Sequence, residues 1–270
     1  MRVFEVSDSN ETARVMIEMS EKLTKPPIIE AVLDIDCDLP PSLDFKALRE
    51  LAYKSFSENY PVIETRFMFE HEIEHEVDAK GEAPPRATVR HGVDGYLFKN
   101  GQESQIVQVR TRGYSFNRLT PYSSLDDYMP EVKRTWEVFV SLVEPVRINA
   151  IRLRYINRIC IPFSVDTINL DEFLRAVPQL PDTESLTLAG FLIQYLATES
   201  GTRNQVKTIL TAQEPQDRML PIIFDITATN GELRQRDDWN QIVETIQSLR
   251  KLKNRVFYRT LTEKCLQLLR

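Results

Sequence analysis

Residues 147–163 read Arg-Ile-Asn-Ala-Ile-Arg-Leu-Arg-Tyr-Ile-Asn-Arg-Ile-Cys-Ile-Pro-Phe, and this stretch decides the fold. Apolar side chains occupy every second position through most of it, which is typical of a strand with one buried face. Residues 27–36, Pro-Ile-Ile-Glu-Ala-Val-Leu-Asp-Ile-Asp, alternate in the same way. Each run is followed by a short amphipathic stretch, several shorter alternating runs and a long helical pattern. The sequence therefore predicts one order of elements that occurs twice.

The repeated order divides the chain into halves of nearly equal length, 25–146 and 147–270, after a polar tail at 1–24. A duplicated unit commonly builds two half-sheets that complete one structure. We predict an α+β protein in which two tandem β-α-β-strands-α halves form one antiparallel sheet, open or barrel-like, with helices on its outer face. Met19 offers an alternative start, so residues 1–18 could also be an appended arm.

Periodicity and turn residues place the individual elements. Helical patterns cover 44–57, 125–144, 170–176 and the region from Asp237 or Asp238 to the C-terminus. Alternating runs predict strands at 62–78, 86–99, 104–112, 114–119, 186–198, 204–212 and 219–229. Asp94-Gly95 offers a turn that would split the run at 86–99 into a hairpin.

Composition removes several functional classes. The net charge of −6 argues against broad nucleic-acid binding, and no apolar run approaches the roughly 18 residues of a membrane span. The cysteines Cys37, Cys160 and Cys265 form no CxxC pair and are predicted to be buried thiols in a reducing cytoplasm. Glycine-rich phosphate loops and the GxSxG elbow are missing. We expect no cofactor, and we lean towards a protein without catalytic activity.

Four short stretches, in this order and spacing, carry a family resemblance. They are Lys25-Pro26-Pro27-Ile28-Ile29-Glu30-Ala31-Val32, Phe116-Asn117-Arg118-Leu119-Thr120-Pro121-Tyr122, Leu153-Arg154-Tyr155-Ile156-Asn157-Arg158 and Asn254-Arg255-Val256-Phe257 with Leu261-Thr262-Glu263-Lys264. Together they resemble a sporadically distributed bacterial family of uncharacterised proteins of about this length. Leu125 stands where that family has a tryptophan, and residues 1–24 extend beyond its usual start. The resemblance implies a bacterial cytosolic protein with a fold shared end to end, and it supplies no catalytic residue.

His71-Glu72-Ile73-Glu74-His75 matches the HExxH pattern of zinc peptidases. That chemistry needs a helix, which brings the two imidazoles onto one face. Around the motif, however, apolar residues and histidines alternate with acids from 67 to 78, with Met68 as the one exception, which is a strand pattern. Residues four apart on a strand are separated by about 13 Å, too far to share one zinc ion. We therefore predict a strand over 67–77 and no zinc site.

A set of arginines is the main candidate for a ligand site. Alternation places Arg152, Arg154 and Arg158 on one face of the strand at 147–163, and further arginines surround the hairpin at Gly113. Guanidinium groups bind phosphate or carboxylate bidentately. The alternative is structural pairing with acids of the strand at 28–38 across the sheet. The candidate ligand-binding residues are Arg110, Arg112, Arg118, Arg152, Arg154, Arg158, Glu30 and Asp34.

The C-terminal helix combines an apolar stripe with a basic remainder, Arg250, Lys251, Lys253, Arg255 and Arg259, which is typical of a solvated face and could also dock an acidic partner. Our first hypothesis is a non-enzymatic, cytosolic binding or interaction protein that takes a partner protein or a small anionic ligand. The sporadic distribution of the family favours a regulatory or defence role. The second hypothesis is a metal-dependent phosphate-handling enzyme that uses the acid- and arginine-lined sheet face. The sequence leaves the oligomeric state open.

Overall fold

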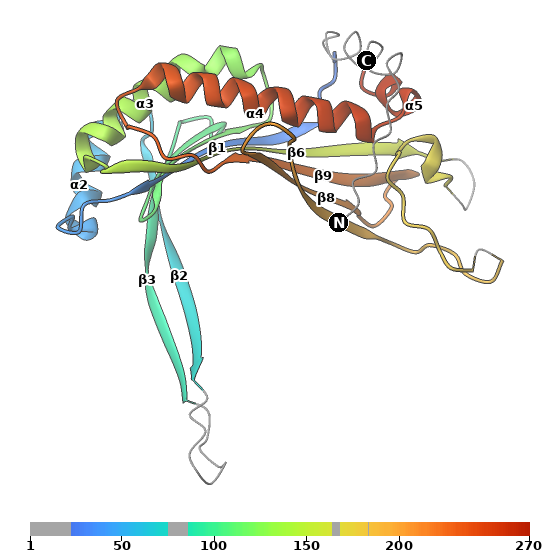
Figure 1. Cartoon of the computed structure of the whole chain (residues 1–270), viewed down its shortest axis with the longest axis horizontal. Coiled ribbons are helices and arrows are strands. Elements are labelled where there is room, and N and C mark those ends of the chain that lie inside the picture. Colours follow the sequence, from blue (N-terminus) through green and yellow to red (C-terminus); the bar gives the residue numbers. More distant parts are fainter. Residues whose placement is uncertain (1–22, 75–85, 164–167, 183) are drawn as a thin grey trace.

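The computed structural model describes residues 23–74, 86–163, 168–182 and 184–270. Its centre is one nine-stranded, wholly antiparallel sheet that stays open rather than closing into a barrel, in the order β2-β3-β4-β5-β1-β6-β9-β8-β7 (Figure 1). The α+β class predicted from the sequence is confirmed, and the barrel-like alternative is not formed. The strands are β1 (Ile28–Asp38), β2 (Val62–Glu74), β3 (Arg86–Lys99), β4 (Gln105–Arg110), β5 (Gly113–Leu119), β6 (Arg147–Pro162), β7 (Leu192–Thr198), β8 (Asn204–Ala212) and β9 (Met219–Asn230).

The two halves of the chain meet at the middle of the sheet. Strands β1 and β6 lie side by side there, because Leu33 pairs with Leu153 and Ile35 with Ile151. Outward from β1 the order is β5, β4, β3 and β2, and outward from β6 it is β9, β8 and β7. Each half therefore places its first strand at the centre and adds its later strands in reverse chain order. This order matches the predicted repeat, and descent from a duplication stays a prediction.

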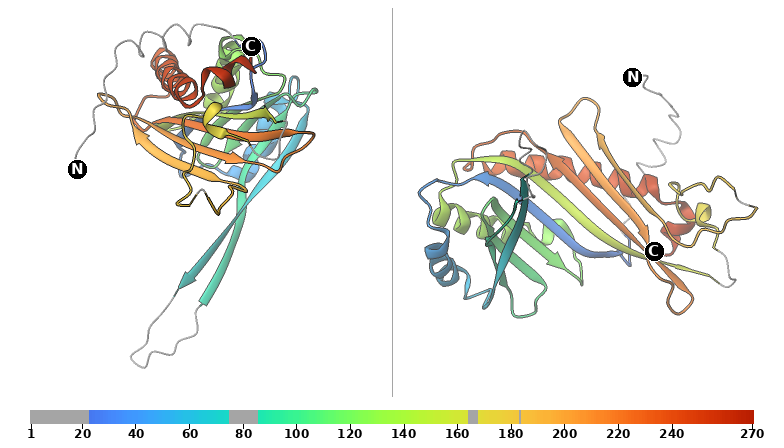
Figure 2. Two further views of the ribbon diagram at one scale, coloured as in Figure 1. Left: turned by 90° about the vertical axis from the view of Figure 1, so that its right-hand side faces the viewer. Right: turned by 90° about the horizontal axis from the view of Figure 1, so that it is seen from below.

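Helices cover one face of the sheet. The long helices α3 (Leu125–Val143) and α4 (Trp239–Thr260) lie on that face, and the shorter α2 (Phe45–Phe56) packs against α3 (Figures 1 and 2). A short helix, α5 (Glu263–Gln267), follows α4. Asp44, Ser124 and Asp238 are the N-cap residues of α2, α3 and α4, and Asp238 is one of the two starts expected for the last helix.

The core lies between the helices and this face of the sheet. Alternation along β1 and β6 sends Leu33, Ile35, Ile151, Leu153 and Tyr155 towards the helices, where each is at most 1% exposed. Burying such a side chain contributes about 1.5–3 kcal/mol. The opposite face of the same strands carries the charged residues. The apolar face thus fixes the register, and the register in turn decides which charges meet.

The hairpin of β2 and β3 extends away from the sheet on the side opposite α4 (Figure 1). Strand β3 pairs with β4 only from Gly95 to Lys99, so the rest of the hairpin is a two-stranded arm. The expected split at Asp94-Gly95 is wrong. Gly95 instead lies so close to β4 that a Cβ atom there would be 2.9 Å from the carbonyl oxygen of Val109.

Of three further predictions, the first is confirmed in part, the second is wrong and the third holds for two of the three cysteines. The strand through the HExxH stretch is confirmed as far as Glu74, and residues 75–77 lie outside the described residues. The helix expected at 170–176 is wrong, because only a single 3-10 turn, η1 (Leu170–Glu172), forms. Cys37 and Cys265 are buried as expected, whereas Cys160 is exposed on β6.

Gly113 begins β5 at the tight connection from β4. Its φ of +130° is a backbone conformation that side-chain-bearing residues rarely adopt. A Cβ atom would lie 2.2 Å from the carbonyl oxygen of Ile35 and 2.9 Å from the backbone nitrogen of Cys37. Only glycine therefore lets β5 approach β1 at this point.

No helix among the described residues is long and apolar enough to cross a membrane.

Candidate functional site

The charged face of the sheet, opposite the helices, holds a network of paired side chains. Arg110 of β4 lies 3.2 Å from carboxylate oxygens of both Asp34 and Asp36 on β1. Arg152 of β6 lies 2.5 Å from Asp36, and this contact raises the pKa of the guanidinium. The carboxylates of Asp34 and Asp36 on β1 thus form ion pairs with arginines of other strands.

Arg154 has a different partner, Asp225 of β9. Its Nε and Nη2 atoms donate to the carboxylate at 3.0 and 2.6 Å in a two-pronged contact. The Asp225 side chain is only 10% exposed, whereas that of Arg154 is 44% exposed. Glu30 accepts a hydrogen bond of 2.6 Å from Asn117. The network therefore draws on residues that were not among the predicted site residues, Asp36, Asn117 and Asp225.

The eight predicted site residues do not form one cluster. Alternation places Arg110, Arg152, Arg154, Glu30 and Asp34 together on the charged face, with Arg158 exposed at the far end of β6. The remaining two residues, Arg112 and Arg118, lie elsewhere.

Arg112 is exposed in the turn between β4 and β5. Arg118 pairs with Ala31, whose side chain is buried in the core, so it lies on the helix-covered side. There its guanidinium donates to the Ser104 hydroxyl and to the Pro121 carbonyl oxygen, both at 3.1 Å. The arginines counted from the sequence as one array are thus distributed over both sides of the sheet.

Replacing Arg154 with alanine is expected to destabilise the fold by about 2–3 kcal/mol, because it leaves the buried Asp225 carboxylate without its partner. Adding Asp225→Asn should recover part of this loss by removing the stranded charge. Urea unfolding of the two single variants and the double variant measures the coupling. Arg158→Ala, which removes an exposed arginine of the same strand, should change stability by less than about 0.5 kcal/mol. Equal losses for Arg154→Ala and Arg158→Ala would contradict the pairing.

A second feature, on the helix-covered side, is a cavity of about 410 Å³. Its walls come from α4, from β6, from the link between β5 and α3, and from the segment that leads into β1. Its volume lies in the usual range for small-molecule sites. The lining residues are Leu23, Thr24, Pro26, Pro27, Ile28, Tyr122, Ser123, Ser124, Asp127, Tyr155, Asn157, Arg250, Lys253, Asn254, Phe257 and Tyr258.

Lys253 is the unusual member of this lining. Its residue exposure is 8%, and its Nζ atom lies 3.8 Å from the centre of the Tyr155 ring. Burial and then the nearby charge of Arg250 lower the pKa of Lys253 from 10.5 to about 7. Among the described residues no carboxylate forms an ion pair with it. A cation over an aromatic ring gains about 0.5–2 kcal/mol, which is less than burial of an unpaired charge costs.

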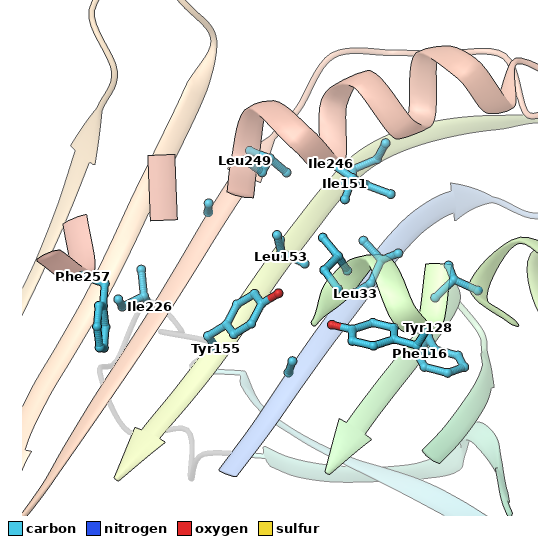
Figure 3. Packing of buried hydrophobic residues seen from close by; sticks show 14 of the residues in the cluster. Leu33, Phe116, Tyr128, Ile151, Leu153, Tyr155, Ile226, Ile246, Leu249 and Phe257 are labelled. Atoms are coloured by element: carbon cyan, nitrogen blue, oxygen red, sulfur yellow. The ribbon is translucent and has the colours of Figure 1, made fainter. Parts of the chain in front are cut away.

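Tyr122 and Tyr155 line the cavity, and Tyr128 lies beside Tyr122. The hydroxyl groups of Tyr122 and Tyr155 are 3.1 Å apart, and those of Tyr155 and Tyr128 point towards one another (Figure 3). Burial is the main cause that raises the pKa of all three phenols. They are therefore neutral hydrogen-bonding groups at neutral pH and do not compensate the charge of Lys253.

Two charged side chains complete the lining. Arg250 lies one turn before Lys253 on α4, and its Nη1 atom donates to both carboxylate oxygens of Asp126, at 2.8 and 3.0 Å. Within the described part of the chain its Nη2 atom has no hydrogen-bond partner. Asp127 accepts the backbone N–H of Ser124 at 2.9 Å in the capping box of α3. The positive charge of the cavity is therefore concentrated at Lys253 and Arg250.

The four stretches that carry the family resemblance converge on this cavity. Pro26, Pro27 and Ile28 come from the first, Tyr122 from the second, Tyr155 and Asn157 from the third, and Asn254 and Phe257 from the fourth. They come from distant parts of the sequence, and the fold brings them together. Comparison with known proteins adds no name to the site. The sequence matches no protein-family model, and no curated protein is similar to it.

The basic composition of the last helix predicts a solvated face that includes Lys253, and for this residue the prediction is wrong because it is buried. The spacing of the apolar residues in this helix does indicate that Lys253 is buried. Ile242, Ile246, Leu249 and Phe257 are buried at helical intervals, and Lys253 falls between the last two on the same stripe. A cation within an apolar stripe is the pattern that indicates a buried lysine.

Proposed function

We propose that this protein is a non-enzymatic binding protein that holds a small anionic ligand in the cavity between α4, β6 and the start of α3. One observation carries the proposal: the amine of Lys253 is buried, lines a cavity and, when protonated, has no carboxylate partner among the described residues. Buried charges are normally paired, since an unpaired one is unfavourable. A ligand anion would supply the missing partner.

The cavity supports an anion site better than the charged sheet face does. On the sheet face, Arg110, Arg152 and Arg154 already contact acids. An incoming phosphate would have to displace those carboxylates. In the cavity, Lys253 has no such competitor among the described residues. The neighbouring Arg250 contacts Asp126 through its Nη1 atom, and within the described part of the chain its Nη2 atom is left for a ligand. The aromatic rings of Tyr155 and Phe257 suit a flat apolar portion of the ligand.

The metal-dependent phosphate enzyme has less support. Its carboxylates would have to be available for a cation, but Asp34, Asp36 and Asp225 contact arginines. Within the residues that the structure describes, no three His, Cys, Asp or Glu side chains gather as they would around a metal ion. The remaining part of the proposal, a bacterial cytosolic protein with a regulatory or defence role, is supported only by the family resemblance and the family's sporadic distribution.

We expect benzoate and pyrophosphate to raise the melting temperature of the protein by several degrees at saturating concentration, by mass action. These two probes carry no aldehyde or ketone group and pair with protonated Lys253, so their affinity should fall above pH 7, by up to about tenfold per pH unit. The other ionisable side chains of the lining are Tyr122, Asp127, Tyr155, Arg250 and Tyr258. Differential scanning fluorimetry between pH 6 and pH 9 measures both effects.

Matched variants separate the two candidate sites. Lys253→Gln should abolish the thermal shift, whereas Arg152→Gln and Arg154→Gln should preserve it. A shift that is lost in the two arginine variants and kept in Lys253→Gln would move the anion site to the charged sheet face. The absence of any shift with both probes at pH 6.5 would refute the proposed function.

A further inference from the structure

We propose that Lys253 captures its ligand covalently, by forming a reversible imine with an aldehyde or ketone that also carries an acidic group. The inference rests on the proposed anion-binding function and names the chemical class of the ligand. Three observations support it, and all concern the Lys253 amine and the groups that the fold places around it.

The first support is the position of the amine. Lys253 lines the cavity, above the Tyr155 ring, with no ion pair to a carboxylate among the described residues. A lysine in a salt bridge is held in its protonated form and cannot attack a carbonyl carbon. The pKa of about 7 means that a large fraction of Lys253 is the neutral, nucleophilic amine at pH 7.5, whereas an ordinary lysine is about 0.1% neutral there.

The second support is the arrangement of charge along α4. Arg250 lies one helical turn from Lys253 and lines the same cavity, and its Nη2 atom is available within the described part of the chain. A carboxylate or phosphate bound there leaves the rest of a small ligand beside the amine. Holding the carbonyl group at the amine raises its effective concentration, which favours a step that is weak between free molecules.

The third support is the set of neutral hydroxyl groups. Imine formation joins the lysine nitrogen to the carbonyl carbon, giving a carbinolamine, and then expels the carbonyl oxygen as water. The nitrogen loses its protons and the departing oxygen gains them, so no oxidant or reductant is needed. Tyr122 and Tyr155, which line the cavity, carry linked hydroxyl groups that can donate to this oxygen and accept from it.

Three related probes test the inference: benzoate has the anion alone, benzaldehyde has the carbonyl alone, and 4-formylbenzoate has both. Each is incubated with the full-length protein at pH 7.5 with sodium cyanoborohydride, which reduces any imine to a stable amine. Intact mass and peptide mapping then locate the adduct. We expect one adduct of 4-formylbenzoate per chain, at Lys253, formed at least about tenfold faster than at the exposed Lys251 of the same helix.

Two kinds of control complete the test: other probes on the natural protein, and variants of Lys253 and Arg250. Benzoate should protect Lys253 by competition, and benzaldehyde should label it at least about tenfold more slowly because it lacks the anion. Lys253→Arg and Lys253→Gln should remove the adduct, and Arg250→Gln should bring the rate with 4-formylbenzoate down to that with benzaldehyde. Labelling should accelerate as the pH rises through 7.

The possible outcomes are distinct. Labelling spread evenly over surface lysines, or none at Lys253, overturns the inference. If benzoate still gives a thermal shift that depends on Lys253, the anion-binding function stands without the covalent step. If benzoate gives no shift and Lys253 is not labelled, both proposals fail. Equal rates with benzaldehyde and 4-formylbenzoate would contradict anchoring by Arg250.

Discussion

Replacing Lys253 with methionine is expected to stabilise the ligand-free protein at neutral pH. Methionine keeps a long unbranched side chain over the Tyr155 ring and removes the charge that burial disfavours. Lowering the pKa from 10.5 to about 7 corresponds to a penalty on the order of 4 kcal/mol for the protonated form. The contact with the aromatic ring offsets only part of it, so the net gain at pH 7 should be a few kcal/mol.

The pH dependence of stability gives this prediction its signature. Between about pH 7 and pH 10.5 the unfolded chain binds more protons than the folded protein at Lys253, so the free energy of unfolding of the natural sequence rises with pH there. The Lys253→Met variant lacks this contribution. Its advantage should therefore be largest at and below pH 7 and should disappear as the pH approaches 10.5. Urea unfolding at several pH values measures the difference between the two proteins.

Lys251→Met is the matched control, since Lys251 is exposed on the same helix. It should leave the stability and its pH dependence unchanged within about 0.5 kcal/mol. If Lys253→Met lowered the stability at pH 7, the charge of Lys253 would be compensated in the folded protein, and the argument for a ligand anion would lose its basis. Stability gained together with loss of anion binding would identify Lys253 as a residue kept for binding at the expense of stability.

Replacing Gly113 with alanine should be the most damaging single-methyl change in the sheet. Two effects add, the strain of a side chain at a φ of +130° and the clash of the new Cβ with the carbonyl oxygen of Ile35. Strain and overpacking each cost about 1–3 kcal/mol, so a total of about 4 kcal/mol is expected. The clash is with backbone of a central strand, which has no side-chain rotamer to relieve it.

Two other glycines separate the contributions. Gly201 has a φ of +75° and open space around its Cα, so Gly201→Ala should show the strain alone, about 1 kcal/mol. Gly101 has open space without a positive φ and should tolerate alanine. Thermal and urea unfolding of the three variants check this ranking. A Gly113→Ala protein as stable as Gly101→Ala would mean that β5 does not approach β1 as described.

The sequence predicted the architecture because its longest strands carry the clearest pattern. Alternation in β1 and β6 identifies both central strands and their buried faces, and the N-caps Asp44 and Ser124 mark where helices begin. The helix predicted at 170–176 does not form, because the helical turn there ends after the three residues Leu170–Glu172.

The candidate site was harder to predict, because a charged residue's partner depends on which strands become neighbours. Asp225 lies in an apolar strand 71 residues after Arg154, and only the pairing of β6 with β9 brings the two together. Closeness in sequence groups Arg118 with Arg110 and Arg112, but its position opposite Ala31 places it on the helix-covered side. No single stretch of the sequence marks the cavity, since its walls come from four distant segments.

The position of β1 at the middle of the sheet bears on how the chain is made. The first half emerges from the ribosome before β6 exists, so β1 can pair with β5 while its other edge waits for a partner. A bare strand edge is the kind of surface at which nascent chains aggregate, and charged side chains discourage that pairing. Asp34, Asp36 and Asp38 alternate along this edge. In the nascent chain these carboxylates discourage pairing of the free β1 edge with other chains. Once β6 has formed, Arg152 pairs with Asp36 and Arg147 with Asp38.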